Sequence, residues 1–438
     1  MSTESKATLE KLVALCKRRG FVYQSAEIYG GLNGVYDFGY LGTLVKQNLR
    51  AVWLTAMNSC KGDMLQLEGS LLGSRAVWEA SGHIQNFHDP MVDCLQCKHR
   101  YRADDIDLNK PCPHCGNKNW TEIREFNMMF KTYVGATAEQ GSEAYLRPET
   151  AQAIFINFKN VISTNRVKIP FGIAQIGKAF RNEITPKQFL FRMREFEQME
   201  MEWFCKGETA EKDFEYWCEQ RHNFYAILGL TMSRIRMRPH AKDELAHYSK
   251  ACTDVEYQFP FGWKELEGIA YRGDFDLSQH TKFSGKDLAV FDEETKTSYM
   301  PHVVECSVGA DRLFLTLLFD SYDEDVVEGE TRIVLRFNPA VAPIKAAFLP
   351  LTKKQSDATE KIYTAIKQTG LVVDFDESGS IGKRYRRQDE IGTPLCFTYD
   401  FESETDNAVT VRNRDTTKQE RISIDKVESY LQDFFTKK

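Results

Sequence analysis

Two charged segments near the middle of the chain carry residue types suited to binding a nucleotide. They read Phe-Arg-Asn-Glu at 180–183 and Phe-Arg-Met-Arg-Glu-Phe-Glu-Gln-Met-Glu at 191–200, with seven residues between them. We predict two strands joined by a short loop, with Arg181 and Glu183 on one face of the first, because side chains alternate along a strand. Arginine suits phosphate because its guanidinium group binds two oxygens and stays charged.

The same alternation predicts a shared face on the second segment, formed by Arg192, Arg194, Phe196, Gln198 and Glu200. Alternating charge on one strand usually indicates a face exposed to water. The aromatic residues Phe189, Phe191 and Phe196 are unusual on such a face. An aromatic ring can stack on a base, and a carboxylate can bind an ammonium group. Charge on both strands therefore favours a binding site.

Four cysteines form two pairs with the spacing of a zinc site. They are Cys94, Cys97, Cys112 and Cys115, and fourteen residues separate the two pairs. Zn²⁺ takes thiolate ligands in tetrahedral geometry, and four thiolates leave no open position. We predict a structural zinc ribbon at about residues 92–120, with His99 and His114 as bystanders.

Composition is that of a globular protein that does not enter a membrane. The 438 residues are 42% hydrophobic, which is enough for two or three domains with a large core. The longest apolar run, 313–319, is too short to span a bilayer, and the first residues lack the apolar region of a secretory signal. An odd number of cysteines, eleven, argues against a disulfide framework and predicts a reducing cytoplasm.

Charge by itself gives no indication of a nucleic-acid partner. The net charge is −6, but binding depends on where basic residues cluster. The densest cluster, at 383–387, is interpreted alone as a solvated loop.

The chain divides into a long strand-rich part and a short α/β part. An acidic stretch at 320–330 and prolines at 339 and 343 place the main boundary near 335–341, giving domains at 1–337 and 338–438. The second domain is predicted to have strands at 345–349, 371–375 and 395–399 and helices at 353–368 and 424–435, with a mainly parallel sheet. In the first, we predict a helix beginning near Pro148.

Several ordered motifs give the chain a resemblance to a known family. They lie at 18–23, 27–34, 101–104, 146–152, the two charged segments, 262–270, 305–312, 380–385 and 389–392. With these motifs the chain resembles the glycyl-tRNA synthetases of the homodimeric class II type. It departs from the family pattern at Tyr40 and Cys306, where proline is usual.

The resemblance implies an α+β fold. The class II catalytic domain would be an antiparallel sheet flanked by helices, with the zinc ribbon as an insertion, followed by an α/β anticodon-binding domain. It implies an obligate homodimer in which a helix at 41–58 packs across the two-fold axis. It also implies that glycine and ATP form a glycyl-adenylate, from which glycine passes to the terminal ribose of tRNA.

Roles for individual residues follow from the same resemblance. Arg181, Arg312 and Glu183 would be catalytic, with Arg181 contacting both the glycine carboxylate and the α-phosphate, and Phe196 would stack on adenine. The remaining ATP-binding positions would be Asn182, Phe191, Arg192, Met193, Arg194, Glu195, Glu265, Leu266, Gly309, Ala310 and Asp311. Glu265 would help to hold Mg²⁺.

Glycine would be recognised through its ammonium group and by exclusion of larger side chains. Glu149, Glu200, Glu305 and Ser307 would form an acidic pocket. Further glycine-binding positions would be Arg102, Phe196, Glu197, Gln198 and Met199. Crowding would reject the methyl group of alanine, so no editing site is needed.

Two alternatives stay open at this point. A non-catalytic relative that binds nucleic acid or regulates a partner would lose the arginines and the acidic pocket, whereas this chain keeps Arg181, Arg312 and Glu149. A synthetase for another small amino acid would share the C-terminal module. The motifs at 147–150 and 305–307, with the cysteine insertion, favour glycine.

Overall fold

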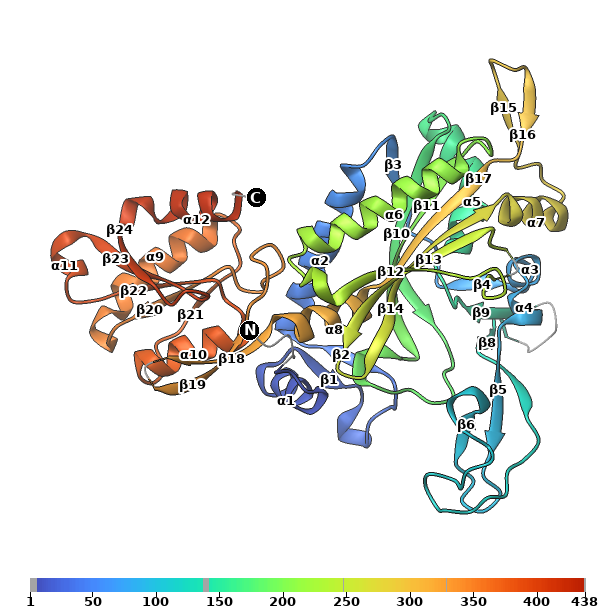
Figure 1. Cartoon of the computed structure of the whole chain (residues 1–438). Coiled ribbons are helices and arrows are strands. Elements are labelled where there is room, and N and C mark those ends of the chain that lie inside the picture. The colour runs from blue at the N-terminus through green and yellow to red at the C-terminus, as the bar shows by residue number, and fades with distance from the viewer. Residues whose placement is uncertain (1–5, 137–141, 247, 328, 437–438) are drawn as a thin grey trace.

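A seven-stranded sheet forms the centre of the larger part of the computed structural model, which describes residues 6–136, 142–246, 248–327 and 329–436 (Figure 1). Every neighbouring pair in this sheet is antiparallel except β10 with β3, as predicted. The strand order is β12 (Ile235–Pro239), β13 (Ala251–Phe259), β14 (Gly262–Gly273), β17 (His302–Gly309), β11 (Glu195–Cys205), β10 (Phe171–Phe180) and β3 (Asp63–Gln66).

The two faces of this sheet are covered differently. One face packs fully against α2 (Tyr40–Asn58), α6 (Ala210–Ile227) and α8 (Ala310–Ser321), and its core includes Met199, Met201 and Val308. The other face is covered only in part, by α5 (Ala151–Asn165) and α7 (Phe275–Ser284), over a smaller core around Phe171 and Phe204 (Figure 1). The rest of that face is left for polar side chains.

Smaller elements surround the large sheet. These are α1 (Leu9–Arg19), β1 (Val22–Gln24), β2 (Tyr36–Phe38), β4 (Leu72–Ser74), α3 (Arg75–Ala80), α4 (His83–Asn86), β8 (Phe130–Tyr133), β9 (Glu143–Leu146), β15 (Val290–Asp292) and β16 (Thr297–Tyr299). A three-stranded sheet of β5 (His88–Asp93), β6 (Arg100–Arg102) and β7 (Arg124–Asn127) supports a segment that projects away from the body and carries the four cysteines (Figure 1). Within the described residues, no helix is long and apolar enough to cross a membrane.

A second sheet, of five strands, lies in the C-terminal part. Its order is β21 (Val373–Phe375), β20 (Ala346–Pro350), β22 (Leu395–Tyr399), β23 (Ala408–Asn413) and β24 (Gln419–Ser423), with α9 (Ser356–Gln368), α10 (Ile381–Ile391), α11 (Ser403–Asp406) and α12 (Val427–Thr436) around it. The prediction of a mainly parallel sheet holds for β20, which pairs parallel with β21 and β22, but not for β23, which pairs antiparallel with β22 and β24. β23 and β24 were not predicted from the sequence, because Arg412, Gln419 and Glu420 interrupt an apolar strand pattern.

The basic cluster at 383–387 lies in helix α10, so its interpretation as a solvated loop was wrong. Arg384 is buried and donates hydrogen bonds to the carbonyl oxygens of Gly379, at 3.0 Å, and Pro350. The guanidinium group therefore satisfies carbonyl groups at the end of β20 and before the helix instead of facing water.

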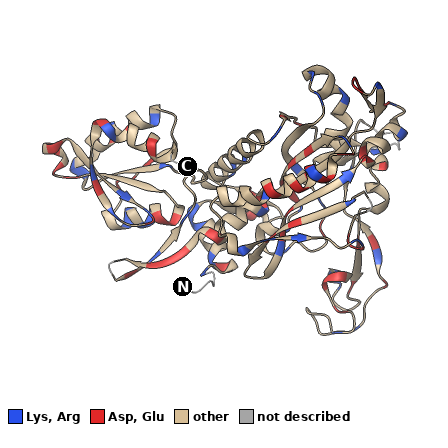
Figure 2. Cartoon of the chain, turned by 45° about the horizontal axis from the view of Figure 1, so that its top comes forward, with Lys and Arg blue, Asp and Glu red and all other residues tan. Residues whose placement is uncertain are grey.

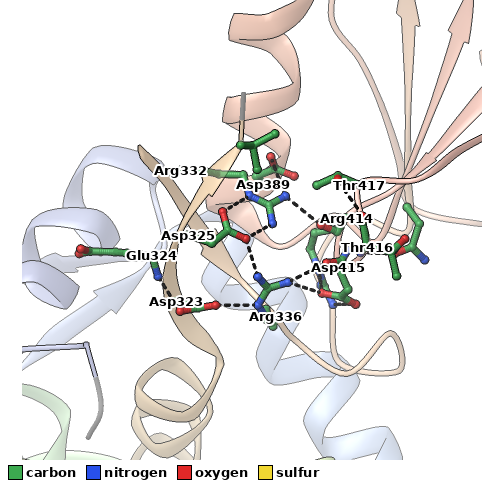
Figure 3. A network of polar contacts seen from close by, with 12 residues as sticks. Asp323, Glu324, Asp325, Arg332, Arg336, Asp389, Arg414, Asp415, Thr416 and Thr417 are labelled. Atoms are coloured by element: carbon green, nitrogen blue, oxygen red, sulfur yellow. Dashed lines mark hydrogen bonds and ion pairs between the residues drawn. The ribbon is translucent and has the colours of Figure 1, made fainter. Parts of the chain in front are cut away.

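A hairpin of β18 (Tyr322–Val327) and β19 (Glu330–Leu335) connects the two sheets, and acidic residues run along it (red in Figure 2). Arg332 on this hairpin is fully buried and bonds to Asp325 (Nε to Oδ1, 2.7 Å), to Asp389 of α10 (3.3 Å) and to the carbonyl oxygen of Arg414 (2.8 Å) (Figure 3). Arg336 joins Asp325 and Asp415 in the same network. The hairpin is thus held to the C-terminal part by ion pairs.

Candidate active site

Polar side chains from neighbouring strands lie together on the partly open face of the large sheet. Antiparallel pairing places Glu200 of β11 opposite Ser307 of β17, and Glu202 opposite Glu305. On the other side of β11, Gln175 of β10 lies opposite Glu200. Residues opposite each other point to the same face, so Glu200, Glu305 and Ser307 converge as predicted for a pocket.

Glu149 joins this pocket from the turn before α5. Its carboxylate lies 3.2 Å from Nε2 of His83 and accepts a hydrogen bond from Gln152 at 3.1 Å. Thr150, the next residue along the chain, donates its hydroxyl to Glu200. The helix start therefore connects two of the predicted glycine-binding carboxylates.

An arginine that the sequence analysis did not identify borders the same carboxylates. Arg272 of β14 binds Asp276 with two hydrogen bonds, of 2.7 and 2.8 Å, and also binds Glu305. Gln152 donates to Asp276 at 3.2 Å, and its Oε1 accepts a hydrogen bond from Nε2 of His280 at 2.8 Å. This network fixes the positions of Glu149 and Glu305 on either side of Glu200.

Burial and mutual repulsion shift the pKa values of these acids. Burial, together with the charges of Glu305 and Glu149, raises the pKa of Glu200 to about 8. Burial also raises the pKa of Glu305, against the effect of Arg272. In Glu149 burial acts to raise the pKa, but His83 and Arg272 outweigh it and hold the pKa below its usual value. The pocket combines one stable anion, Glu149, with two carboxyl groups whose pKa values are raised, Glu200 and Glu305.

A second pocket, beside the first, is lined by predicted nucleotide-binding residues. Its lining residues are Glu183, Leu190, Phe191, Arg192, Met193, Phe196, Glu197, Gly309, Asp311 and Arg312. The guanidinium carbon of Arg312 lies 4.4 Å from the centre of the Phe191 ring, and its Nη1 donates to the carbonyl oxygen of Glu265 at 2.8 Å. Burial, partly offset by Arg192, raises the pKa of Glu183. Cations, a carboxyl group and aromatic faces thus meet in one place.

Arg181 stands between the two pockets. Its Nε donates to the carbonyl oxygen of Pro148, next to Glu149, at 3.1 Å. Its guanidinium carbon lies 5.4 Å from the centre of the Phe196 ring in the second pocket. This side chain can therefore contact both a group bound to the carboxylates and one bound near Phe196.

The predicted strands extend too far into the connection between them. β10 ends at Phe180 and β11 begins at Glu195, so Arg181–Glu183 and Arg192–Arg194 lie in the connecting segment rather than on strand faces. Pro186 has no N–H for strand pairing, and Gln188 and Phe189 have left-handed φ values of 59° and 56°. The segment still folds back, because the N–H of Arg181 donates to the carbonyl oxygen of Arg194 at 2.9 Å.

Several predicted site residues point to the helical side of the sheet. Glu197 binds Arg50 of α2, with Nε to Oε1 at 2.8 Å, and Asp311 accepts the N–H of Glu197 at 2.7 Å. The side chains of Met199, Leu266 and Ala310 are in the core. Strand alternation thus turns the side chains of Glu197 and Met199, both predicted as glycine-binding positions, away from the side chain of Glu200.

Other predicted residues hold the site together. Arg194 donates to the carbonyl oxygens of Glu183, at 3.0 Å, and Asn33, at 2.8 Å. Glu195 pairs with Lys178 at the surface. Gln198 accepts the N–H of Thr150 at 3.2 Å, and the N–H of Asn182 bonds to the carbonyl oxygen of Met128. Arg102 pairs with Asp89 at 3.0 Å, in the charged group around Glu183 rather than in the network of Glu149, Glu200 and Glu305.

The sequence analysis missed Arg272, Asp276, Glu202, His83 and Gln152. Gln152 stands inside the motif at 146–152 and could have been identified there. Arg272 and Asp276 have the four-residue spacing of a charge pair, although nothing in the sequence brings them to Glu305. That contact depends on the pairing of β14 with β17.

The four cysteines come together as the spacing predicts. The Sγ atoms of Cys94 and Cys115 lie 3.6 Å apart, and those of Cys97 and Cys112 lie 3.7 Å apart. All four fit a single metal ion, since tetrahedral zinc with bonds of about 2.3 Å separates its sulfurs by about 3.8 Å. His99 and His114 stack on each other with ring centres 3.7 Å apart.

Comparison with known proteins gives matches along almost the whole chain. Residues 130–322 match the family described as "tRNA synthetase class II core domain (G, H, P, S and T)", and residues 340–434 match "Anticodon binding domain". The chain is 51% identical to a protein named glycine--tRNA ligase from Caldanaerobacter subterraneus subsp. tengcongensis, over 98% of each chain. It is 50% identical to the proteins of that name from Geobacillus thermodenitrificans, over 97% of each chain, and Acetivibrio thermocellus, over 99% of each chain.

Proposed function

Because the chain belongs to the glycine--tRNA ligase family of class II aminoacyl-tRNA synthetases, we propose that its two adjoining pockets join glycine to ATP. The enzyme attaches glycine to tRNA, and it combines a class II core with an anticodon-binding domain. The position of Arg181 is the observation that best supports the proposed site. Its side chain donates to the carbonyl oxygen of Pro148, next to Glu149, and lies over the ring of Phe196.

In the first step the glycine carboxylate attacks the α-phosphorus of ATP and pyrophosphate leaves. Arg181 would hold both reacting groups and neutralise the charge that develops at the phosphate, which is the main contribution an enzyme makes to this kind of transfer. Phe196 would stack on adenine, while Arg192 and Arg312 would border the rest of the nucleotide. Mg²⁺ would be held by ATP phosphates and the half-exposed carboxylate of Glu265, since this ion takes few protein carboxylates.

The acidic pocket would bind the ammonium group of glycine. Glu149, Glu200 and Glu305 surround the site, Ser307 adds a hydroxyl, and Gln198 donates toward Ser307 at 3.4 Å. Arg272 keeps Glu305 in place rather than contacting ATP. A larger amino acid would need to displace this fixed network, and displacement of buried ion pairs is costly.

The test is ATP–pyrophosphate exchange measured with each of the twenty amino acids. Exchange with glycine alone would support the proposed pocket. Exchange with another small amino acid would retain the chemistry and overturn the assignment of the pocket. No exchange with any amino acid would favour a non-catalytic protein that binds tRNA without activating an amino acid.

Further parts of the proposal concern assembly and organisation. We propose domains at 1–337 and 338–438, a cytoplasmic location, and a homodimer with α2 at the two-fold axis. All eleven cysteines are free, which suits a reducing compartment. Tyr40, at the start of α2, is 66% exposed and would be available for contact with a partner there. Light scattering should give twice the 50.5 kDa mass of one chain.

Purified protein is expected to contain about one zinc ion per chain, held by the four cysteines. Cys94→Ser and Cys112→Ser remove buried ligands and should each lose the metal, as measured by elemental analysis. His99→Ala should keep it, because the four thiolates complete the coordination. Cys60→Ser, outside the cluster, is the matched cysteine control. Folded wild-type protein without metal would contradict this prediction.

The KM for glycine is expected to fall as pH rises from about 6 to about 8, by at most about tenfold per pH unit. The sign follows from Glu200, whose pKa of about 8 keeps it protonated at the lower pH, whereas an ammonium group binds the carboxylate. Glu200→Gln should raise the KM and remove this pH dependence, while the KM for ATP serves as the internal control. An unchanged slope in the variant would refute the role of Glu200.

A further inference from the structure

Glu202 is a fully buried carboxyl group directly behind the proposed amino-acid pocket. It lies two residues from Glu200 on β11, so both side chains point to the same face of the sheet. Its cross-strand neighbours are Glu305 on β17 and Ile173 on β10. Its side chain is 0% exposed, and neither carboxyl oxygen has a hydrogen-bond partner among the described residues.

The groups that face Glu202 leave it without a compensating charge. Single carboxylate oxygens of Glu200, Glu202 and Glu305 all lie within 4.8 Å of one another. The nearest cation is Arg272 of β14, whose guanidinium already binds Asp276 of α7 and Glu305. Asp276 of α7 adds a further negative charge, and the remaining sides, Ile173 of β10 and the apolar core under α5 and α7, carry none.

Two negative charges placed directly opposite each other on neighbouring strands repel strongly when buried. Burial and the charge of Glu305 therefore raise the pKa of Glu202 well above its usual value. A protonated carboxyl group, in contrast, carries a donor for a neighbouring carboxylate, and an oxygen of Glu305 lies within 4.8 Å of one of Glu202.

We propose that Glu202 is a positioning residue for the amino-acid substrate, which stays protonated and donates a hydrogen bond to Glu305. This inference rests on the proposed activation of glycine. Arg272 would hold one side of the Glu305 carboxylate and Glu202 the other, which fixes the direction in which Glu305 meets the ammonium group. Glu202 itself lies behind Glu200 and Glu305 and does not contact the substrate.

Two substitutions separate this role from simple packing. Glu202→Gln keeps the size and a donor without charge, whereas Glu202→Met keeps the length and removes the donor. We expect the glutamine variant to keep both KM values within about threefold, and the methionine variant to raise the KM for glycine about tenfold, as for a lost bond to a charged group. The KM for ATP should stay unchanged in both.

Glu267 provides a matched control on the opposite face of the sheet. It is also 0% exposed, but it is paired with Arg221 at 2.6 Å and with the hydroxyl of Tyr225. Glu267→Gln should lower Tm because it removes a charge from a satisfied pair, whereas Glu202→Gln should leave Tm unchanged. Loss of Tm in Glu202→Gln equal to that in Glu267→Gln would show that Glu202 is charged and overturn the proposal.

Infrared spectroscopy gives a readout that does not depend on activity. At neutral pH the wild type should show a protonated-carboxyl band that is weaker in Glu202→Gln, and an identical band in both would overturn the proposal. If the wild type shows no glycine-dependent exchange, the proposed function fails while the infrared result still stands. A second metal ion per chain, lost in Glu202→Gln, would show that the carboxylates bind a cation instead.

Discussion

Arg181→Ala is expected to reduce glycine-dependent ATP–pyrophosphate exchange by about 10³-fold, the upper end of losses seen when one group that stabilises a transition state is removed. The side chain is partly exposed and donates a hydrogen bond to the carbonyl oxygen of Pro148 at 3.1 Å. Its removal should therefore cost little stability. Exchange kinetics together with Tm would separate the two effects.

Two further variants make this result specific. Arg181→Lys keeps the charge but loses the fork that binds two oxygens, so an intermediate loss is expected. Arg100→Ala removes an arginine that is 57% exposed and paired with Asp93 in the cysteine segment, and it should leave exchange unchanged. Folded Arg181→Ala that retains exchange would refute the assignment of Arg181.

Asp389→Ala is expected to lower the free energy of unfolding by about 3–5 kcal/mol, because removing one member of a buried ion pair leaves the other charges uncompensated. Asp389 binds Arg412 through two hydrogen bonds, of 2.9 and 3.1 Å. It also pairs with Arg332 at 3.3 Å (Figure 3). Arg332 is 0% exposed and Arg412 only 5%. Denaturant unfolding would measure the change.

Asp415 is the comparison for this prediction. It also pairs with Arg336 and Arg414 in the network, but its side chain is 45% exposed, so water can replace the lost contacts. Asp415→Ala should cost less than about 1 kcal/mol. Equal losses of stability in Asp389→Ala and Asp415→Ala would show that burial does not determine how much these ion pairs stabilise the fold.

Local patterns and the resemblance predict different elements. The strand expected from its apolar run at 395–399 is β22 with the same bounds. The helix at 41–58, which the resemblance implies, is α2, Tyr40–Asn58. The antiparallel sheet, the class II fold and the anticodon-binding domain were expected from the family motifs, which the comparisons confirm.

What the sequence could not show depends on pairing between distant strands. Glu200 and Glu305 were expected together only through the resemblance, and it is the register of β11 with β17 that brings Glu202 opposite Glu305. Arg272 reaches the pocket in the same way. By contrast, the orientation of Glu197 and Met199 could have been predicted from the sequence, since alternation from Glu200 already places their side chains on the other face.

The buried pairs of the β18–β19 hairpin have a consequence for how tRNA would be bound. Arg332, through Asp389 and the carbonyl oxygen of Arg414, joins the C-terminal part to the hairpin that follows α8. We therefore expect that a tRNA that must reach both the proposed site and the anticodon-binding domain has to match the span between them. Asp389→Ala tests this expectation as well. A loosened hairpin should impair the transfer of glycine to tRNA, while ATP–pyrophosphate exchange continues.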